Sequence, residues 1–273
     1  MTSEHARDLT LKGVVAERRI IAEDHVLLSI RAGEIFQSSS PGQFVMIRVT
    51  DTESPFLSRP ISIYALSRED GTAVIDLMVR VVGRGTSFLS RLKAGDRVDL
   101  LGPLGNGFSI LPDRSQIVLI AGGIGIAPIS FLADGYSHIK TGEVTCYFGA
   151  RSESVLVGLD RVNKACSRLI LSTEDGSRGY RGLITDLFER DLNKYNREDT
   201  VIYACGPSPM LMKIQALLKK KSIICQVSVE ERMACGVGAC LGCAVRMKSG
   251  EYRRVCHEGP VFSIEELAFD QEG

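Results

Sequence analysis

Four cysteines near the C-terminus have the types and spacing of a redox centre. Cys235, Cys240 and Cys243 follow a C-x4-C-x2-C pattern, and Cys256 comes later in the same segment. This is the spacing of a plant-type [2Fe-2S] cluster, in which thiolates hold two irons and two sulfides. The residues between the first three are small or apolar, so the loop can wrap tightly and offer backbone N–H groups to sulfur. The segment therefore predicts a one-electron carrier.

Zinc and disulfides are the two other interpretations of these cysteines. Structural zinc sites usually pair their ligands in two close clips, whereas here only Cys240 and Cys243 form a C-x2-C clip. A disulfide requires an oxidising compartment, and residues 1–13 are polar and charged, without an apolar export signal. The spacing favours iron and sulfide, with zinc kept as the alternative.

Length and charge limit the class of protein. A chain of 273 residues exceeds what one hydrophobic core normally organises, so two or three domains are expected. Lys plus Arg and Asp plus Glu balance at 33 each, which argues against a nucleic-acid or anionic-membrane partner. The most apolar window, 117–133, is interrupted by glycines and a proline and falls short of the roughly 20 residues of a membrane span. We expect a cytoplasmic protein.

The first third of the chain contains short β-rich runs separated by turn residues. Strands are expected at 10–15, 25–30, 43–49 and 73–82, and one short helix at 87–92. Turn pairs such as Pro41-Gly42 and Asp70-Gly71 lie between several of the strands. Strands at this spacing predict an antiparallel barrel or sandwich.

Two motifs in this region can bind a phosphorylated ring compound. In Arg59-Pro60-Ile61-Ser62, the arginine can hold a phosphate and the serine can hydrogen-bond a ring nitrogen. In the stretch 83–87, Gly85 and Thr86 open the short helix, whose first N–H groups can hold a pyrophosphate. Each motif by itself also describes a surface arginine or an ordinary helix cap.

The middle third has the pattern of a parallel α/β domain. A buried strand at 116–121 runs into Gly-Gly-Ile-Gly-Ile-Ala-Pro at 122–128 and a helix to about 140, and further strands follow. This turn, with Gly123 and Gly125, departs from G-x-G-x-x-G, yet it lets the backbone approach a nucleotide in the same way. The last strand ends in Cys205-Gly206-Pro207, at the carboxyl edge where such sheets bind ligands.

Taken in this order, the motifs resemble the ferredoxin-NADP reductase superfamily, whose two domains bind FAD and a pyridine nucleotide. The segments 231–243 and 255–262 further resemble the electron-transfer subunits of class B dihydroorotate dehydrogenases. This resemblance implies cluster ligands at Cys235, Cys240, Cys243 and Cys256. It implies flavin contacts at Arg59, Pro60, Ile61, Ser62, Met78, Val79, Arg80, Gly85 and Thr86. It also implies nucleotide contacts at Gly123, Gly125, Cys205, Gly206 and Pro207. Many members carry a stacking tyrosine where Ile61 stands.

The resemblance also implies an architecture and a role. We expect an FAD-binding β-barrel at 1–110, a pyridine-nucleotide-binding α/β domain at 111–225 and a [2Fe-2S] domain at 226–273. Electrons from dihydroorotate, oxidised on FMN in a separate catalytic subunit, would pass through the cluster and FAD to NAD+, in a heterotetramer of two plus two subunits. The chain then needs no catalytic acid or base of its own, and its four histidines form no triad-like set.

Three other functions use the same modules. They are the flavin subunit of an NADH-dependent ferredoxin:NADP or sulfide oxidoreductase, a reductase that feeds an oxygenase, and a non-enzymatic redox sensor. The choice of NAD rests on the resemblance, because Arg151 and Glu153 after the second strand of the α/β domain favour opposite nucleotides.

Overall fold

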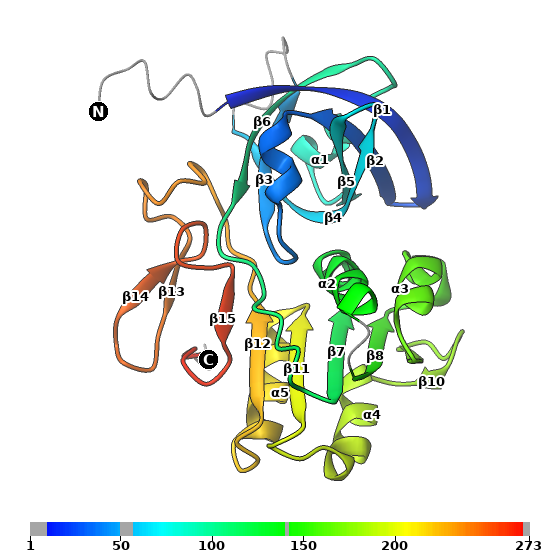
Figure 1. Cartoon of the computed structure of the whole chain (residues 1–273), viewed down its shortest axis with the longest axis vertical. Helices are drawn as coiled ribbons and strands as arrows, with labels where there is room; N and C mark the ends of the chain where they lie inside the picture. Colours follow the sequence, from blue (N-terminus) through cyan, green and yellow to red (C-terminus); the bar gives the residue numbers. More distant parts are fainter. Residues whose placement is uncertain (1–9, 50–56, 140–141, 270–273) are drawn as a thin grey trace.

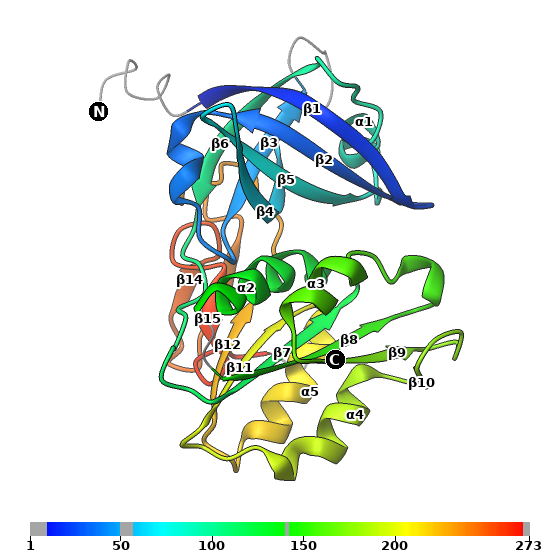
Figure 2. The same cartoon turned by 45° about the vertical axis from the view of Figure 1, so that its right-hand side comes forward.

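The computed structural model describes residues 10–49, 57–139 and 142–269. A barrel lies at one end, an α/β domain at the other, and the C-terminal segment runs alongside both (Figure 1, Figure 2). No helix among these described residues is long and apolar enough to cross a membrane.

The N-terminal domain is a closed antiparallel barrel, which is one of the two architectures, barrel or sandwich, expected from the sequence. Its strands follow the order β1-β2-β5-β4-β3-β6 and enclose a core of alternating inward side chains. The bounds are β1 Thr10–Ala22, β2 His25–Ala32, β3 Phe44–Val49, β4 Arg59–Glu69, β5 Thr72–Arg80 and β6 Arg97–Leu104, with a 3-10 turn η1 at Glu34–Ser38.

The short helix α1 spans Arg84–Leu89, three residues earlier than expected. The Thr86 hydroxyl explains this early start, because it accepts hydrogen bonds from the N–H groups of Val82, at 2.9 Å, and Gly83, at 3.2 Å. The local cap sets the first turn before the apolar residues of the helix begin.

The second domain is a mainly parallel sheet with helices on both faces. Its order is β10-β9-β8-β7-β11-β12-β15, and only β15 is antiparallel. Residues of β7 alternate between the two faces: Ile117 and Leu119 pack with α2, and Val118 packs with α4 and α5. The strands are β7 Gln116–Gly122, β8 Glu143–Ala150, β9 Arg168–Thr173, β10 Tyr180–Arg181 and β11 Thr200–Cys205. The helices are α2 Ile126–Ile139, α3 Leu159–Ala165, α4 Ile184–Asp191 and α5 Ser208–Leu218, with 3-10 turns η2 Gly123–Gly125, η3 Glu153–Val155 and η4 Leu192–Lys194.

The C-terminal segment is attached to this sheet. Strand β12 (Ile224–Ser228) is parallel to β11, and β15 (Val261–Ser263) pairs with β12, so the boundary expected after residue 225 falls inside β12. Between them, β13 (Ala244–Arg246) and β14 (Tyr252–Arg254) form a small hairpin. None of these four strands was predicted from the sequence, because each is short and lacks strong alternation.

Hydrogen bonds fix the linker between the barrel and the α/β domain. The hydroxyl of Tyr203 donates to the carbonyl of Ser109 at 2.8 Å, and the Gln226 amide bonds both backbone groups of Ser109. Farther back, the Asn106 amide donates to the carbonyls of His257, at 3.3 Å, and Glu258, at 3.0 Å. One linker thereby holds both domains and the loop that follows Cys256.

Candidate functional site

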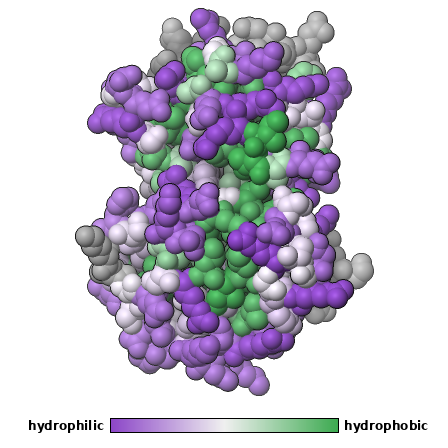
Figure 3. Space-filling view, turned by 90° about the vertical axis from the view of Figure 1, so that its right-hand side faces the viewer, coloured by the Kyte–Doolittle hydropathy of each residue, from purple (hydrophilic) through white to green (hydrophobic). Residues whose placement is uncertain are grey.

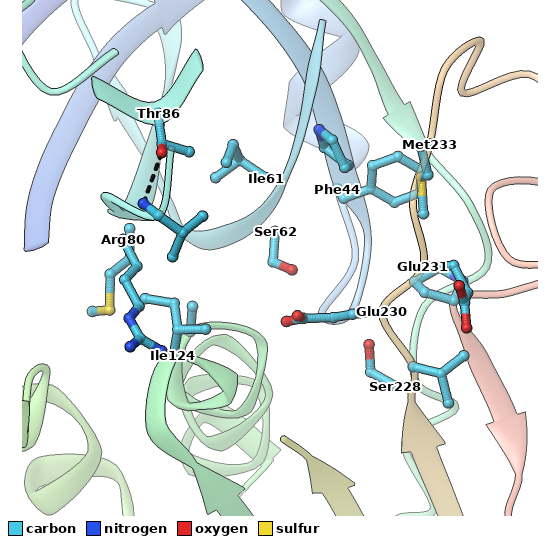
Figure 4. Close-up of a pocket in the computed structure, with 16 residues that line it drawn as sticks. Phe44, Ile61, Ser62, Arg80, Thr86, Ile124, Ser228, Glu230, Glu231 and Met233 are labelled. Carbon is cyan, nitrogen blue, oxygen red and sulfur yellow. Dashed lines mark hydrogen bonds between the residues drawn. The ribbon is translucent and has the colours of Figure 1, made fainter. Parts of the chain in front are cut away.

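A cavity of about 280 Å³ lies where the barrel, α2 and the C-terminal segment meet (Figure 4). On the face drawn in Figure 3, hydrophobic side chains gather across the boundary between the two domains. The cavity is lined by Phe44, Pro60, Ile61, Ser62, Met78, Arg80, Val82, Thr86, Ile124, Ala127, Ser228, Val229, Glu230, Glu231, Met233 and Pro260. Six residues expected to contact flavin are therefore brought to one wall.

Arg59 and Gly85 also meet, although they do not line this cavity. A Cβ atom built on Gly85 would lie 2.1 Å from Nε of Arg59, so the guanidinium rests directly on the first turn of α1. Its Nη1 donates to the carbonyl of Leu57 at 2.6 Å. A guanidinium beside helix N–H groups is a donor set that fits a pyrophosphate.

Strand alternation separates the three residues expected at the end of β5. Met78 and Arg80 line the cavity, whereas Val79 is fully buried in the barrel core. Only the backbone of Val79 can therefore face a flavin. Ile61 lies on the cavity wall and supplies an apolar surface in place of an aromatic ring.

Several cavity residues were missed from the sequence. Phe44 comes from β3, and Ser228 and Glu230 come from the end of β12 and the turn that follows. The signal that could have found Ser228 is its place at the carboxyl end of a parallel strand, but β12 itself was not recognised. Phe44 had no such signal, because alternation alone does not say which face of a barrel strand meets another domain.

The carboxylate of Glu230 points into the cavity toward Ser62 (Figure 4). Glu230 is exposed to the open cavity, and the cavity walls partly shield its carboxylate from bulk solvent. Burial raises the pKa of Glu230 above its usual value, and the charge of Arg80 opposes this only in part. The ionised form is therefore penalised at neutral pH.

Glu230→Gln is expected to stabilise the flavin-free chain at pH 7 and to leave it unchanged near pH 4. Because the folded-state pKa is raised, the penalty is absent below the pKa of the unfolded state and complete above that of the folded state. Solvent access limits the gain to at most about 1 kcal/mol, or about 2–4 °C in Tm. Thermal unfolding at both pH values measures it, with Glu231→Gln as the control. Equal stabilisation at both pH values would contradict this account.

The two motifs expected to bind the nucleotide, 122–128 and 205–207, pack against each other at the carboxyl edge of the sheet. A Cβ atom on Gly125 would lie 2.2 Å from the carbonyl oxygen of Cys205, and one on Gly206 would lie 3.0 Å from the nitrogen of Gly122. Cys205 is buried, and burial raises the pKa of its thiol, so it is a neutral packing residue at this corner. The close approach leaves the backbone at the start of α2 open to a nucleotide.

The four C-terminal cysteines come together at the base of the β13–β14 hairpin. Cys235, Cys240 and Cys243 lie in the loop before it, and Cys256 lies in the loop after it. Backbone N–H groups point at their sulfurs: Gly238 donates to Cys256 at 3.1 Å, Cys256 to Cys243 at 3.4 Å and Val237 to Cys235 at 3.5 Å. Burial of Cys235 is outweighed by its backbone donors, which lower the pKa of its thiol to about 6. Iron binds thiolates, so this donor set fits a cluster.

The cysteines are arranged as two pairs. The Cys235 thiol lies within reach of the Cys240 side chain, and the Cys256 thiol within reach of that of Cys243. Across the described ranges 10–49, 57–139 and 142–269, no three histidine, cysteine or carboxylate side chains are placed to hold a single metal ion. Two thiolates at each of two irons are what a [2Fe-2S] cluster requires, so the pairing favours it over zinc.

Arg254 and Glu258 hold the loop in place. The guanidinium of Arg254 donates to the carbonyl of Gly238 at 2.9 Å and forms an ion pair with Glu258, whose carboxylate also accepts from the N–H of Arg254 at 2.7 Å. His257 covers Gly238 from outside. Arg254 and His257 flank Cys256 in the chain, so their contacts with Gly238 fix the loop of Cys235 and Cys240 relative to Cys256.

Comparison with known proteins defines the class. Residues 12–108 match an oxidoreductase FAD-binding domain, 119–216 an oxidoreductase NAD-binding domain and 230–268 the iron-sulfur cluster binding domain of dihydroorotate dehydrogenase B. The protein is thus a flavin- and NAD-linked iron-sulfur oxidoreductase with the fold of ferredoxin reductases.

The chain belongs to the family of electron transfer subunits of dihydroorotate dehydrogenase B (NAD(+)). It is 40% identical to the subunit of that name from Desulforamulus reducens, covering 89% of this chain and 92% of the relative. It is 42% identical to that from Clostridium acetobutylicum, covering 83% and 85%. Among solved structures, it resembles a chain of the NADH-dependent reduced ferredoxin-NADP oxidoreductase, with a TM-score of 0.83 and 28% identity over 95% of this chain and 90% of the other.

Proposed function

We propose that this chain carries electrons from dihydroorotate, oxidised on FMN in a separate catalytic subunit, to NAD+. The route runs through a [2Fe-2S] cluster held by Cys235, Cys240, Cys243 and Cys256. When bound, FAD exchanges single electrons with the cluster and a hydride with nicotinamide. One observation carries the proposal: Met233, two residues before Cys235, lines the same cavity as the expected flavin residues.

The chain's own residues position these groups. We assign the flavin ring to the wall of Pro60, Ile61, Ser62 and Met78, and its phosphates to Arg59, Gly85 and Thr86, on the backbone and guanidinium donors gathered there. Arg80 and the backbone of Val79 complete that site. We assign NAD to Gly123, Gly125, Cys205, Gly206 and Pro207, on the close approach of the two corners.

The exposed side of the cluster loop is where we place the catalytic subunit. Cys240 is exposed, and its neighbours Leu241 and Val237 are 65% and 43% exposed. Apolar side chains beside a redox centre suit a partner that must bring its own cofactor close. The relatives are named as subunits, which supports a partner, and we propose a heterotetramer of two plus two in the cytoplasm.

We also propose the division into a flavin domain at 1–110, a nucleotide domain at 111–225 and a cluster domain at 226–273. It is supported by a separate barrel core and by the three matched regions. Because β12 and β15 share the sheet of the nucleotide domain, the cluster domain should depend on that sheet for its fold.

Anaerobic co-purification with the catalytic subunit from the same organism tests this function. The complex is expected to contain iron, sulfide, FAD and FMN, and to reduce NAD+ with dihydroorotate, whereas this chain alone should reduce only artificial acceptors with NADH. The alternative is a subunit of an NADH-dependent ferredoxin:NADP oxidoreductase. It is supported by the similarity in fold to a solved structure of such an enzyme, although the sequence identity to that structure is only 28%. Copurification of a ferredoxin-reducing partner, without dihydroorotate activity, would select that alternative.

A further inference from the structure

Strand β3 forms the partition between the flavin cavity and the cluster loop. Phe44 and Met46 lie two positions apart on β3, so their side chains point to the same side of the strand. Both are buried, at 3% and 2% exposed, and both pack outside the barrel core, with side chains of the α/β domain and the C-terminal segment. Phe44 lines the cavity, and its ring faces Met233 (Figure 4). Met46 lies beneath the cluster loop. The same face of one strand therefore touches both places.

The cluster loop approaches this face through a glycine. Gly236 follows Cys235 directly and is buried, and its φ is +72°. A Cβ atom there would lie 2.5 Å from Cγ and 3.2 Å from Sδ of Met46, and 3.3 Å from Leu104. Only a residue without a side chain lets Cys235 come this close to the barrel.

The two sides of the cluster differ in what they contact. Cys240 is exposed on the side where we place the catalytic subunit. Cys235 has Met233 before it in the cavity lining and Gly236 after it against Met46. Met233 before this ligand and Gly236 after it thus both lead to the flavin side, and Met233 packs against the hydrophobic cluster that contains Phe44 and Met46.

We propose that electrons pass between the cluster and the flavin through Cys235, Met233 and Phe44, and that the contact of Gly236 with Met46 sets the separation. The inference rests on the function proposed above. During NAD+ reduction, electrons would pass singly from the bound cluster to the bound flavin, and reduction by NADH would drive the same transfer in reverse; no bond forms or breaks in the partition. Gly236 and Met46 are positioning residues, since they hold Cys235 against the wall.

Gly236→Ala in the full chain, loaded with iron, sulfide and FAD, tests the proposal. NADH reduces the flavin, and bleaching of the cluster absorption then reports the internal transfer. We expect full cofactor content, unchanged direct reduction by dithionite and an internal transfer slowed on the order of 10- to 100-fold, because small misplacements have large kinetic effects. Hydrogen exchange of the 234–238 amides should rise and reports the displacement without any turnover.

Two companion variants separate distance from loop strain. Gly250→Ala adds the same methyl group at a similar positive φ of +88°, in the turn between β13 and β14 where no other atom lies within 4 Å, and should transfer electrons like the wild type. Adding Met46→Ala to Gly236→Ala removes the clashing Cγ and should restore much of the rate, which a strained φ alone would not allow.

Wild-type transfer in a fully loaded Gly236→Ala chain overturns the proposal, as does equal slowing in Gly250→Ala or no recovery in the double variant. If Gly236→Ala fails to hold its cluster, Phe44→Leu decides, since it leaves the loop unchanged: slower transfer at full FAD content supports the route, and an unchanged rate overturns it. A wild-type chain that binds FAD and a cluster but transfers no electrons between them would instead contradict the proposed function.

Discussion

Replacement of Cys240 by serine is expected to abolish the cluster while FAD stays bound. A neutral serine hydroxyl does not replace a thiolate, so one iron loses a ligand. Cys240 is the best ligand to change, because it is exposed and its loss removes little packing. Iron should fall from about two per chain to near zero. Dihydroorotate-dependent reduction of NAD+ by the complex should fall to background, whereas NADH should still reduce a dye that accepts electron pairs.

Cys166→Ser is the matched control, since Cys166 is partly buried and lies at the end of α3, outside the cluster segment. It should keep its iron. Loss of FAD together with iron in Cys240→Ser would mean that the flavin site depends on the cluster loop. Retention of iron would remove Cys240 from the ligand set.

Gly125→Ala should weaken productive NADH binding on the order of tenfold and leave FAD and iron in place. The added Cβ would meet Cys205 and Gly206 at backbone atoms, 2.2 Å from the nearest, and backbone cannot rotate away as a side chain can. The end of β11 and the start of α2 must separate. Such overpacking typically costs about 1–3 kcal/mol, and a loss of 1.4 kcal/mol in binding is about tenfold in affinity. Reduction of the bound flavin by NADH, followed by stopped flow, measures the effect.

Gly71→Asn provides the comparison for this variant. Gly71 has φ +81° in the open turn between β4 and β5, where an added Cβ would have no atom within 4 Å, and asparagine tolerates that conformation. The control should bind NADH normally. A Gly125→Ala chain with unchanged stability and unchanged flavin reduction would show that this corner does not shape the nucleotide site.

Local pattern was enough to predict most strands of the two large domains. The run at 116–121 became β7, ending one residue later, because a continuous apolar strand before glycines is specified by its own residues. The helix expected at 87–92 was placed too late, since the hydroxyl of Thr86 decides its start. The strands of the C-terminal segment escaped notice because β12 and β15 gain their stability from pairing within the large sheet.

The sequence by itself determined the order of the three matched regions and the close spacing of the four cysteines, since these depend on residue types at short spacing. The tertiary structure decided which distant residues meet: the guanidinium of Arg59 over Gly85, Glu230 opposite Ser62 in the cavity between the domains, and Gly236 against Met46. Each of these contacts joins segments that are separated by loops or by whole domains. Spacing along the chain carries no information about such contacts, because strand order, barrel closure and domain docking bring the residues together.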